Sequence, residues 1–493
     1  CYHGILSAAR CHSPYAYKTT LPLRKLLINE CTIESLIQYP QSHFFKGHMI
    51  ATSLLIFTKG KPTNNPTFNF VRCLEDLDLI SVTDLIQSAY KGHQTDKIRV
   101  ATHTHSELEK QTLTTKYGSW RTFFSPPECL DVMSKLPLLT QHFESVVQGR
   151  LERDEVSSVT SFPFRNWEVK GTKGKDAPSS QFIPGKDKEG AKGLLIKGAT
   201  LQAITDAAAN IPDEYRGYAI KVSHKMGKTL NYELTSDNLS HNYKDGTSDA
   251  ILEPPDLRVG SWNRGNKKAK WDIAFETSLN AMRNHPTVGR FINLVENQLG
   301  LDTRPEKIVW EDLLRPCAGE IILLRSFRTG WRAHLNPLAF NPKSKQLRVS
   351  SNFYSLRSIS TSTGKDSCTD REEAARVLLA FLLSSFGQIQ FEFYGENREG
   401  LRKCEKGTCI ENIHAPHPAS IDKKTRTNIS KLINDLPCPI DCEAHPHSEP
   451  KRRELDLLIA AHLLNLDKEH PKVVDFVNST SAALDELQRE RLG

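Results

Sequence analysis

The sequence predicts an α/β fold at the N-terminus, followed by a mixed α+β region and by C-terminal helices. Three observations carry this prediction. Short apolar runs alternate with a helical pattern over residues 1–62, which is typical of strand–helix–strand units. An apolar run at 321–324 is followed at 371–386 by a helix that is apolar nearly all round, so this helix should be buried. Two further helical patterns, at 452–466 and 473–491, close the chain.

The first 62 residues contain three predicted strands and one predicted helix. Residues 4–9, 33–37 and 51–58 are apolar enough for strands, and leucines at helical spacing predict a helix over 17–29. The last strand is expected to return antiparallel at the edge of the sheet.

Composition predicts two breaks in the chain. Residues 59–67 (KGKPTNNPT) have the composition of a linker, and residues 170–193 are rich in Gly, Lys, Asp and Pro, which predicts a solvated, mobile segment. The predicted organisation is an α/β end domain at 1–62, a helix-bearing connection at 63–170, a flexible linker at 171–193, the first part of the α+β region at 194–310, its main part at 311–435, and C-terminal helices at 436–493.

The composition sets limits on compartment and partner. A net charge of +7 permits a polyanionic partner without requiring one. The longest apolar runs, at 378–383 and 457–464, are too short to span a bilayer, so no membrane partner is expected. Eleven cysteines without an evenly spaced framework predict a reducing cytoplasm.

The stretch from 315 to 418 has the residue types of a surface that contacts DNA. Arg and Lys neutralise phosphates, and Arg and Asn side chains read base edges. Apolar and polar residues alternate from 388 to 393, which predicts a half-buried strand that would support these loops. Phe353 is expected in the core, and Arg325 and Arg398 could instead pair with core carboxylates. The side chains predicted to contact DNA are Arg325, Arg328, Arg332, Asn352, Tyr354, Arg357, Arg398 and Arg402.

The order of the motifs in this half resembles the target-recognition region of adenine-N6-specific DNA methyltransferases of restriction-modification systems. The motifs are SSNFYSLR at 350–357, LLSSFG at 382–387, REGLRK at 398–403 and HAPHP at 414–418. Arg452, Leu455 and Asp456 resemble the start of the closing helix pair of that family, which is expected to pack against the recognition region. Residues 1–62 are similar to the end of its Rossmann-like catalytic domain, through LRKLL at 23–27 and IESLI at 33–37.

This resemblance implies transfer of a methyl group from S-adenosyl-L-methionine to an adenine flipped out of double-stranded DNA. The family uses a Phe-x-Gly-x-Gly loop for the cofactor and an Asn-Pro-Pro-Tyr-type motif for the adenine, and neither occurs in this sequence. The nearest candidates, SPPE at 125–128 and EPPD at 253–256, lack the aromatic residue. Because the chain also starts with Cys1, it is expected to be an N-terminally truncated methyltransferase, inactive alone and without catalytic or cofactor-binding residues.

Three alternatives stay open. The chain could be a DNA-binding specificity or adaptor subunit that acts with a separate catalytic chain or a restriction nuclease. A metal-dependent nuclease could be built on Asp154, Glu168 and Lys170. The run WNRGNKKAKW at 262–271 could contact phosphates and stack on bases, although a solvated basic loop is the simpler interpretation.

Four cysteines form two closely spaced pairs. They are Cys404 with Cys409 and Cys438 with Cys442, and histidines lie near both pairs. Such pairs can hold zinc, but neither has the two-residue spacing of typical zinc sites. Free thiols are the preferred interpretation.

Overall fold

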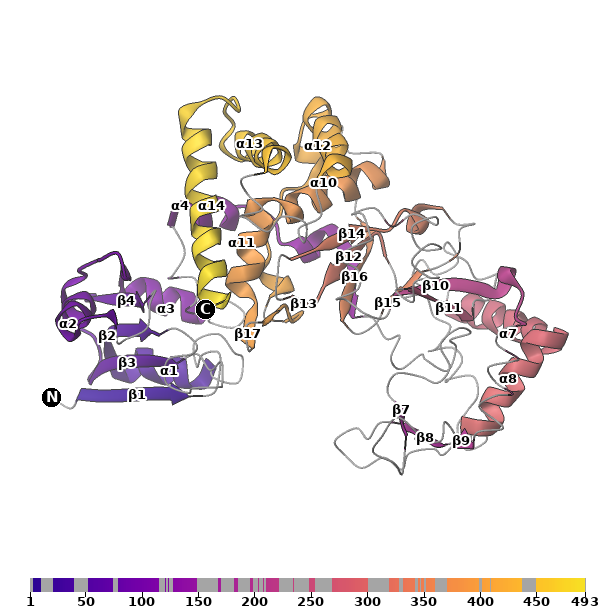
Figure 1. Ribbon diagram of the computed structural model, residues 1–493. Coiled ribbons are helices and arrows are strands. Elements are labelled where there is room, and N and C mark those ends of the chain that lie inside the picture. Colours follow the sequence, from indigo (N-terminus) through magenta and orange to yellow (C-terminus); the bar gives the residue numbers. More distant parts are fainter. Residues whose placement is uncertain are drawn as a thin grey trace.

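The structure of the protein is a computed structural model (Figure 1). It describes residues 3–9, 21–39, 52–73, 79–114, 120, 123, 127–148, 167–169, 181–184, 196–197, 203, 207, 210–220, 234, 248–252, 268–299, 319–327, 331–341, 345, 347–349, 352–359, 370–398, 401–407, 409–436 and 449–492.

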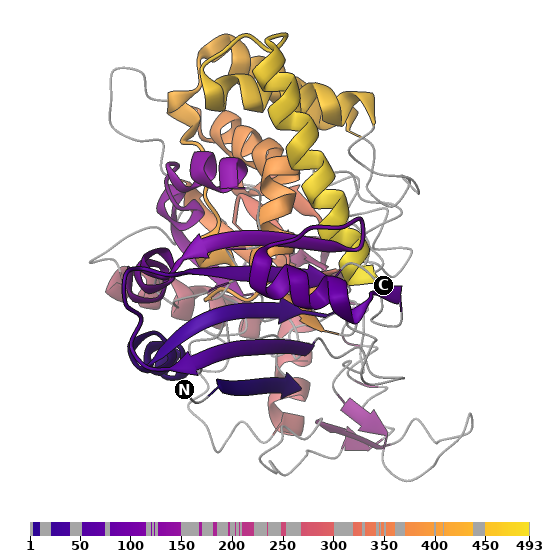
Figure 2. The ribbon, with the colours of Figure 1, turned by 90° about the vertical axis from the view of Figure 1, so that its left-hand side faces the viewer.

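A five-stranded sheet forms the N-terminal part, and Figure 2 turns it toward the viewer. Its strands follow the order β1-β3-β2-β4-β5, in which β2 and β4 are parallel and the other three pairs are antiparallel. The elements of this part are β1 (His3–Ala9), α1 (Leu21–Glu30), β2 (Cys31–Gln38), β3 (Thr52–Lys59), β4 (Thr67–Cys73), α2 (Val82–Lys91), β5 (Ile98–Thr104) and α3 (His105–Thr114).

The three predicted strands and the predicted helix of residues 1–62 are confirmed as β1, β2, β3 and α1. One detail is wrong, because β3 lies between β1 and β2 instead of at the sheet edge. Adjacent residues of β2 face opposite sides of the sheet: Leu36 packs in a core with α1 and α3, and Ile37 packs in a core with α2. This alternation is the ordinary side-chain geometry of a strand.

The predicted boundary at residue 62 falls inside this sheet. Residues 59–67 connect β3 to β4 as a turn in which Asn64 and Asn65 have positive φ angles of 60° and 47°. The Gly60 N–H donates to the Glu30 carbonyl at 2.8 Å, and the Asn65 side chain accepts from the Ser106 N–H at 2.7 Å. The same polar residues that make a linker also make a turn, so composition alone did not separate the two.

A second, four-stranded antiparallel sheet forms the core of the C-terminal part, in the order β14-β12-β16-β6. Its strands are β6 (Phe143–Gln148), β12 (Ile321–Leu324), β14 (Ala333–Leu335) and β16 (Phe353–Ile359). Because β6 pairs with β16, the predicted connection at 63–170 is divided: its first part completes the N-terminal sheet, and its later part, with α4 (Pro127–Ser134), joins the C-terminal core.

Three smaller sheets complete the strand pairing among the described residues. The first is β13 (Ser326–Phe327), β18 (Leu401–Lys403) and β17 (Glu396–Arg398); the second is β11 (Ser248–Leu252), β10 (Arg216–Ile220) and β15 (Leu347–Val349); the third is β7 (Trp167–Val169), β8 (Gln181–Pro184) and β9 (Ile196–Lys197). Strand β8 lies within the predicted flexible linker at 171–193, so that segment contains paired structure. Asp154 and residues 262–267 lie outside the described residues.

Two consecutive buried helices cover the C-terminal sheet. They are α10 (Arg371–Leu383) and α11 (Ser385–Tyr394). The predicted strand at 389–393 is wrong, because its polar residues are buried with partners: the Gln388 amide donates to the Leu383 carbonyl at 2.8 Å, and the Gln390 amide donates to the His414 carbonyl at 2.9 Å. A helix buried on all sides has no amphipathic period, so the alternation was misleading.

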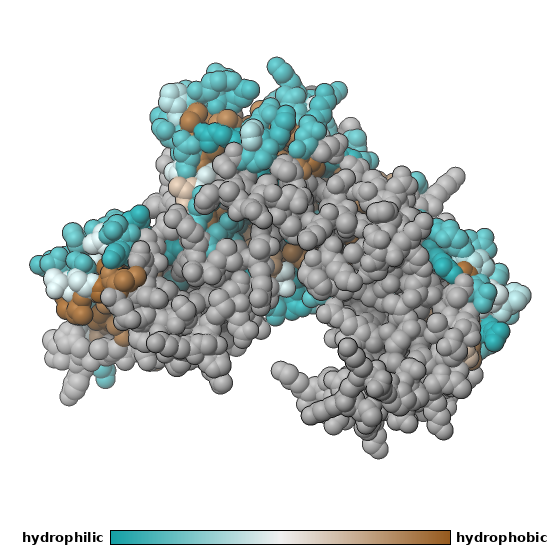
Figure 3. Space-filling model, viewed as in Figure 1, coloured by the Kyte–Doolittle hydropathy of each residue, from teal (hydrophilic) through white to brown (hydrophobic). Residues whose placement is uncertain are grey.

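Within the described residues, no single helix is long and apolar enough to cross a bilayer. Helices α10 and α11 reach that length only together, and they are bent by 64°. Three further helices pack around them: α12 (Lys423–Asp435), α13 (Pro450–Leu464) and α14 (Pro471–Leu492). The outer faces of α12 to α14 are mostly hydrophilic (Figure 3). A separate helical pair, α7 (Lys268–Asn284) and α8 (Pro286–Leu299), lies near β10 and β11 (Figure 1).

Candidate DNA-recognition site

Arg325 lies at the junction of three strands of the C-terminal part. It follows β12 directly, its N–H donates to the Asn352 carbonyl at 2.8 Å before β16, and its own carbonyl accepts from the Cys404 N–H at 2.6 Å after β18. These backbone bonds fix the start of the Arg325 side chain. Its guanidinium Nη2 donates to Glu405 Oε1 at 2.8 Å.

Glu405 gathers several polar side chains around this arginine. Lys403 Nζ lies 2.5 Å from Oε1, and the Tyr354 hydroxyl donates to Oε2 at 3.1 Å. The Lys406 N–H donates to the same hydroxyl at 3.1 Å, and Lys406 Nζ donates to the Val146 carbonyl of β6 at 2.8 Å. We name this set, Arg325, Tyr354, Lys403, Glu405 and Lys406, the Glu405 cluster.

The Glu405 cluster carries a positive charge. Arg325 and Lys403 contact the one carboxylate, and the Lys406 ammonium lies on the Val146 carbonyl; these three cations and one carboxylate give a formal charge of +2. Burial alone would raise the pKa of Glu405, but the hydrogen bonds and charges of Arg325 and Lys403 outweigh it and lower this pKa to about 2. The side chains of Arg325 and Lys403 are 21% and 20% exposed, so both cations can be reached from solvent. Such an arrangement can bind a phosphate.

Two neighbouring aromatic residues of β16, one predicted in the core and one predicted to contact DNA, both belong to the core at this site. Phe353 is fully buried, as expected. Tyr354 is also buried, with only 2% of its surface exposed, so the prediction that it contacts DNA is wrong for this structure. The cause is the position of β16 inside the sheet, where Tyr354 pairs with Leu323 of β12 on one side and with Gln148 of β6 on the other. Burial raises the pKa of the Tyr354 hydroxyl to about 12.

Arg402 is a structural residue instead of a DNA contact. Its Nε lies 2.9 Å from Glu392 Oε2 of α11, and its Nη1 donates to the Gly395 carbonyl at 3.1 Å. Both side chains of this ion pair are almost completely buried. Neighbouring residues of β18 face opposite sides, so Lys403 reaches the Glu405 cluster while Arg402 points into the core.

The prediction that Arg332 contacts DNA is also wrong for this structure. Its carbonyl accepts from the Leu324 N–H at 3.1 Å, which continues the pairing of β14 with β12, and its side chain is buried. Asn352, which directly precedes β16, and Arg357, within β16, are half-buried. Arg328 lies outside the described residues, and of Arg398 the structure describes only its place at the end of β17. For these four residues, DNA contact stays a prediction.

Sequence reasoning did not place Lys403 and Lys406 at the site. The available signal was their position on both sides of Glu405 in the segment KCEK. A carboxylate between two lysines, in a turn after a strand, indicates a small charge cluster, but its arginine partner lies 80 residues earlier in the chain.

Cys404 and Cys409 are buried free thiols beside this site. Burial raises the pKa of Cys404 well above its ordinary value, and the neighbouring Cys409 thiol adds to this effect. Among the residues that the structure describes, no group of three or more His, Cys, Asp or Glu side chains could hold a metal ion. Cys438 and Cys442 lie outside those residues.

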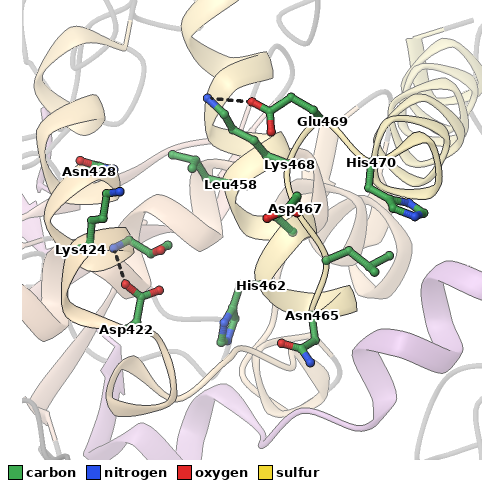
Figure 4. Close-up of a pocket in the computed structure, with 13 residues that line it drawn as sticks. Asp422, Lys424, Asn428, Leu458, His462, Asn465, Asp467, Lys468, Glu469 and His470 are labelled. Carbon is green, nitrogen blue, oxygen red and sulfur yellow. Dashed lines mark hydrogen bonds and ion pairs between the residues drawn. The ribbon is translucent and has the colours of Figure 1, made fainter.

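A separate groove of about 700 Å³ lies between the start of α12 and the turn from α13 to α14 (Figure 4). Lysines and carboxylates line it together, including Lys424, Asp467 and an ion pair of Lys468 with Glu469 at 3.5 Å. Because three carboxylates outnumber two lysines in the lining, and because no residue of the Glu405 cluster reaches the groove, we assign no DNA contact to it.

The N-terminal sheet does not fit the cofactor that the resemblance implies. S-adenosylmethionine needs a glycine-rich loop where the backbone approaches it closely. Residues 1–111 contain Gly4, Gly47, Gly60 and Gly92, all widely separated. Gly60 and Gly92 have positive φ angles of 135° and 70° in turns, and β5 passes directly into α3 without a loop.

Comparisons with known proteins match two stretches of the chain. Residues 15–111 match the family model of N-6 DNA methylases, and residues 282–437 match the specificity domain of restriction endonuclease BpuSI. The chain therefore combines a DNA methylase region with a restriction-enzyme specificity region. This confirms the predicted resemblance to DNA methyltransferases of restriction-modification systems, and the first match extends beyond the predicted boundary at residue 62, into α3.

One of the solved structures that match the chain aligns over nearly its whole length. It is the crystal structure of the type IIG restriction endonuclease BpuSI, with 16% sequence identity and a TM-score of 0.38. The alignment covers 99% of this chain and 47% of that one, so the chain spans about half the length of that enzyme. No curated protein matches the sequence.

Proposed function

We propose that this chain is the DNA-recognition part of an adenine-N6-specific DNA methyltransferase of a restriction-modification system. The observation that carries the proposal is the match of residues 282–437 to a specificity domain, because that range contains Arg325, Lys403 and Lys406 of the Glu405 cluster. The partner is double-stranded DNA. The catalytic motifs that this sequence lacks would have to come from elsewhere, so the chain alone should not transfer methyl groups.

In this proposal the chain positions the duplex and reads its sequence. Arg325, Lys403 and Lys406 hold phosphates, which fixes the register without reading bases. The predicted base-reading side chains are Arg328, Asn352, Arg357 and Arg398, since Arg and Asn offer paired donors and acceptors to base edges. S-adenosylmethionine supplies the methyl group to the flipped adenine when it is bound in a catalytic half. No step of that transfer is assigned to residues of this chain.

Binding of the full chain to a duplex should weaken steeply as salt rises, because neutralised phosphates release counterions. Arg325→Gln and Lys403→Gln should each lower the slope of log K against log salt by about one unit. Fluorescence anisotropy with a labelled duplex measures both effects. Lys451→Gln is the matched control, because Lys451 is exposed on α13 beside Glu454 and should leave the slope unchanged. A flat salt response of the wild-type chain would contradict the proposal.

Binding of S-adenosylmethionine to this chain should be absent or very weak, because residues 1–111 contain no glycine-rich loop. Isothermal titration calorimetry checks this, with a methyltransferase that has the loop as the positive control. A dissociation constant in the micromolar range would show that the cofactor site is built from other residues of this chain.

The alternative is a specificity or adaptor subunit that acts with a separate catalytic chain. The missing catalytic motifs support this alternative equally well. The coding sequence upstream of Cys1 separates the two: a glycine-rich strand loop and an Asn-Pro-Pro-Tyr motif in the same reading frame support the methyltransferase, and a stop codon followed by an independent start supports the adaptor.

A further inference from the structure

Two cations share one oxygen of Glu405. Arg325 Nη2 and Lys403 Nζ lie 2.8 and 2.5 Å from the same atom, Oε1. The second oxygen, Oε2, accepts only a neutral hydroxyl, from Tyr354 at 3.1 Å, among the bonds that the structure describes. An arginine and a lysine that converge on one anionic oxygen form the arrangement that binds a phosphate oxygen. The carboxylate therefore stands where a DNA phosphate would be held.

The backbone of Glu405 is fixed in place, because it is part of a turn. The Glu405 carbonyl accepts from the Cys409 N–H at 2.8 Å and from the Ile410 N–H at 3.2 Å. On the other side, Cys404 is bonded through its N–H to the Arg325 carbonyl. The backbone of Glu405 therefore stays near the cations when a duplex approaches, so its carboxylate remains close to any phosphate that binds there.

The two cations remain accessible to an incoming phosphate. All three charged side chains, Arg325, Lys403 and Glu405, are between 20% and 29% exposed. Because the turn that carries Glu405 is held by backbone hydrogen bonds, exchange of the carboxylate for a phosphate at the two cations is possible without unfolding the turn. The carboxylate, which remains nearby, then repels the phosphate and reduces the binding free energy that each cation–phosphate contact contributes.

We propose that Glu405 is an internal phosphate mimic that limits the affinity of the chain for DNA of arbitrary sequence. It occupies Arg325 and Lys403 when no duplex is bound, and it competes with phosphates when one is. Duplexes that lack base contacts are then held weakly, and base contacts decide which duplexes bind. This inference rests on the proposed DNA-recognition function.

The test is Glu405→Gln in the full chain, because glutamine keeps the size and one acceptor oxygen of the side chain but removes its charge. Binding to a duplex of arbitrary sequence should become about tenfold tighter at low salt, and its salt slope should become steeper by about one unit. Glu405→Asp keeps the charge and should bind like the wild type. The matched control is Glu372→Gln, which removes the same charge from an ion pair with Arg376 on α10. This control should leave the affinity unchanged.

Adding Arg325→Gln and Lys403→Gln to Glu405→Gln should abolish the gain, because the effect acts through these two cations. A Glu405→Gln variant that binds no tighter than Glu372→Gln overturns the inference, and so does one that binds more weakly than the wild type while keeping its melting temperature. In both cases the wild-type chain still binds DNA with a steep salt dependence, so the proposed function stands. Absence of duplex binding by the wild-type chain at low salt overturns both proposals.

Discussion

Replacing Arg402 with methionine is expected to destabilise the C-terminal part by about 3–5 kcal/mol, because it leaves a buried carboxylate without its partner. The Arg402 guanidinium lies 2.9 Å from Glu392, and both side chains are at most 4% exposed. Glu392 belongs to α11, where Phe391 stacks on Trp331 with ring centroids 3.7 Å apart. Urea denaturation followed by tryptophan fluorescence should therefore report the loss.

Two further variants define the origin of this effect. Lys403→Met changes the neighbouring residue of β18, whose side chain is 20% exposed, and should cost less than about 1 kcal/mol. Glu392→Leu combined with Arg402→Met removes both charges and should recover most of the stability. If Arg402→Met keeps the wild-type stability but loses DNA binding, then Arg402 does contact DNA, and its assignment to the core is wrong.

The elements that were predicted correctly from the sequence are those in which a local run of apolar residues indicates burial. Strand β12 and residues 377–383 of helix α10 are continuous apolar runs, and the structure buries all four residues of β12 and nine residues of α10. Helix α11 was missed because its polar residues find partners that are distant in sequence. Gln390 bonds to His414, 24 residues later, and Glu392 bonds to Arg402, ten residues later.

At the site, the role of each arginine could not be predicted from its local sequence. An arginine that binds a phosphate cannot be distinguished in the sequence from an arginine that pairs with a carboxylate. In both cases the guanidinium binds an anion and follows or belongs to a supporting strand. Arg325 and Arg402 both have glutamate partners, but Glu405 keeps Arg325 near solvent, whereas Glu392 draws Arg402 into the core. Only the packing of α11 against β18 separates the two cases.

Two of the motifs that resemble the methyltransferase family, LLSSFG at 382–387 and the start of the closing helices at 452–456, contact each other in the core. In the LLSSFG motif, Ser384 caps α11 at the bend after α10. The Asp456 carboxylate of α13 accepts from the Ser385 N–H at 2.9 Å and from the Ser385 hydroxyl at 2.5 Å. Arg452, one turn earlier on α13, donates to the Leu383 carbonyl at 3.1 Å. The predicted packing of the closing helices against the recognition region is confirmed by these bonds.

Asp456→Ala is therefore expected to destabilise the C-terminal part by about 3 kcal/mol, because the buried N–H and hydroxyl of Ser385 lose their acceptor. Hydrogen exchange should show lost protection in α11 and α13 together, since the carboxylate connects these two helices. Asp467→Ala, at an exposed position between α13 and α14, is the matched control and should change the stability by less than about 0.5 kcal/mol. If Asp456→Ala unfolds at the wild-type urea concentration, the bend is held by apolar packing alone, in which Phe386 of α11 stacks on Phe476 of α14.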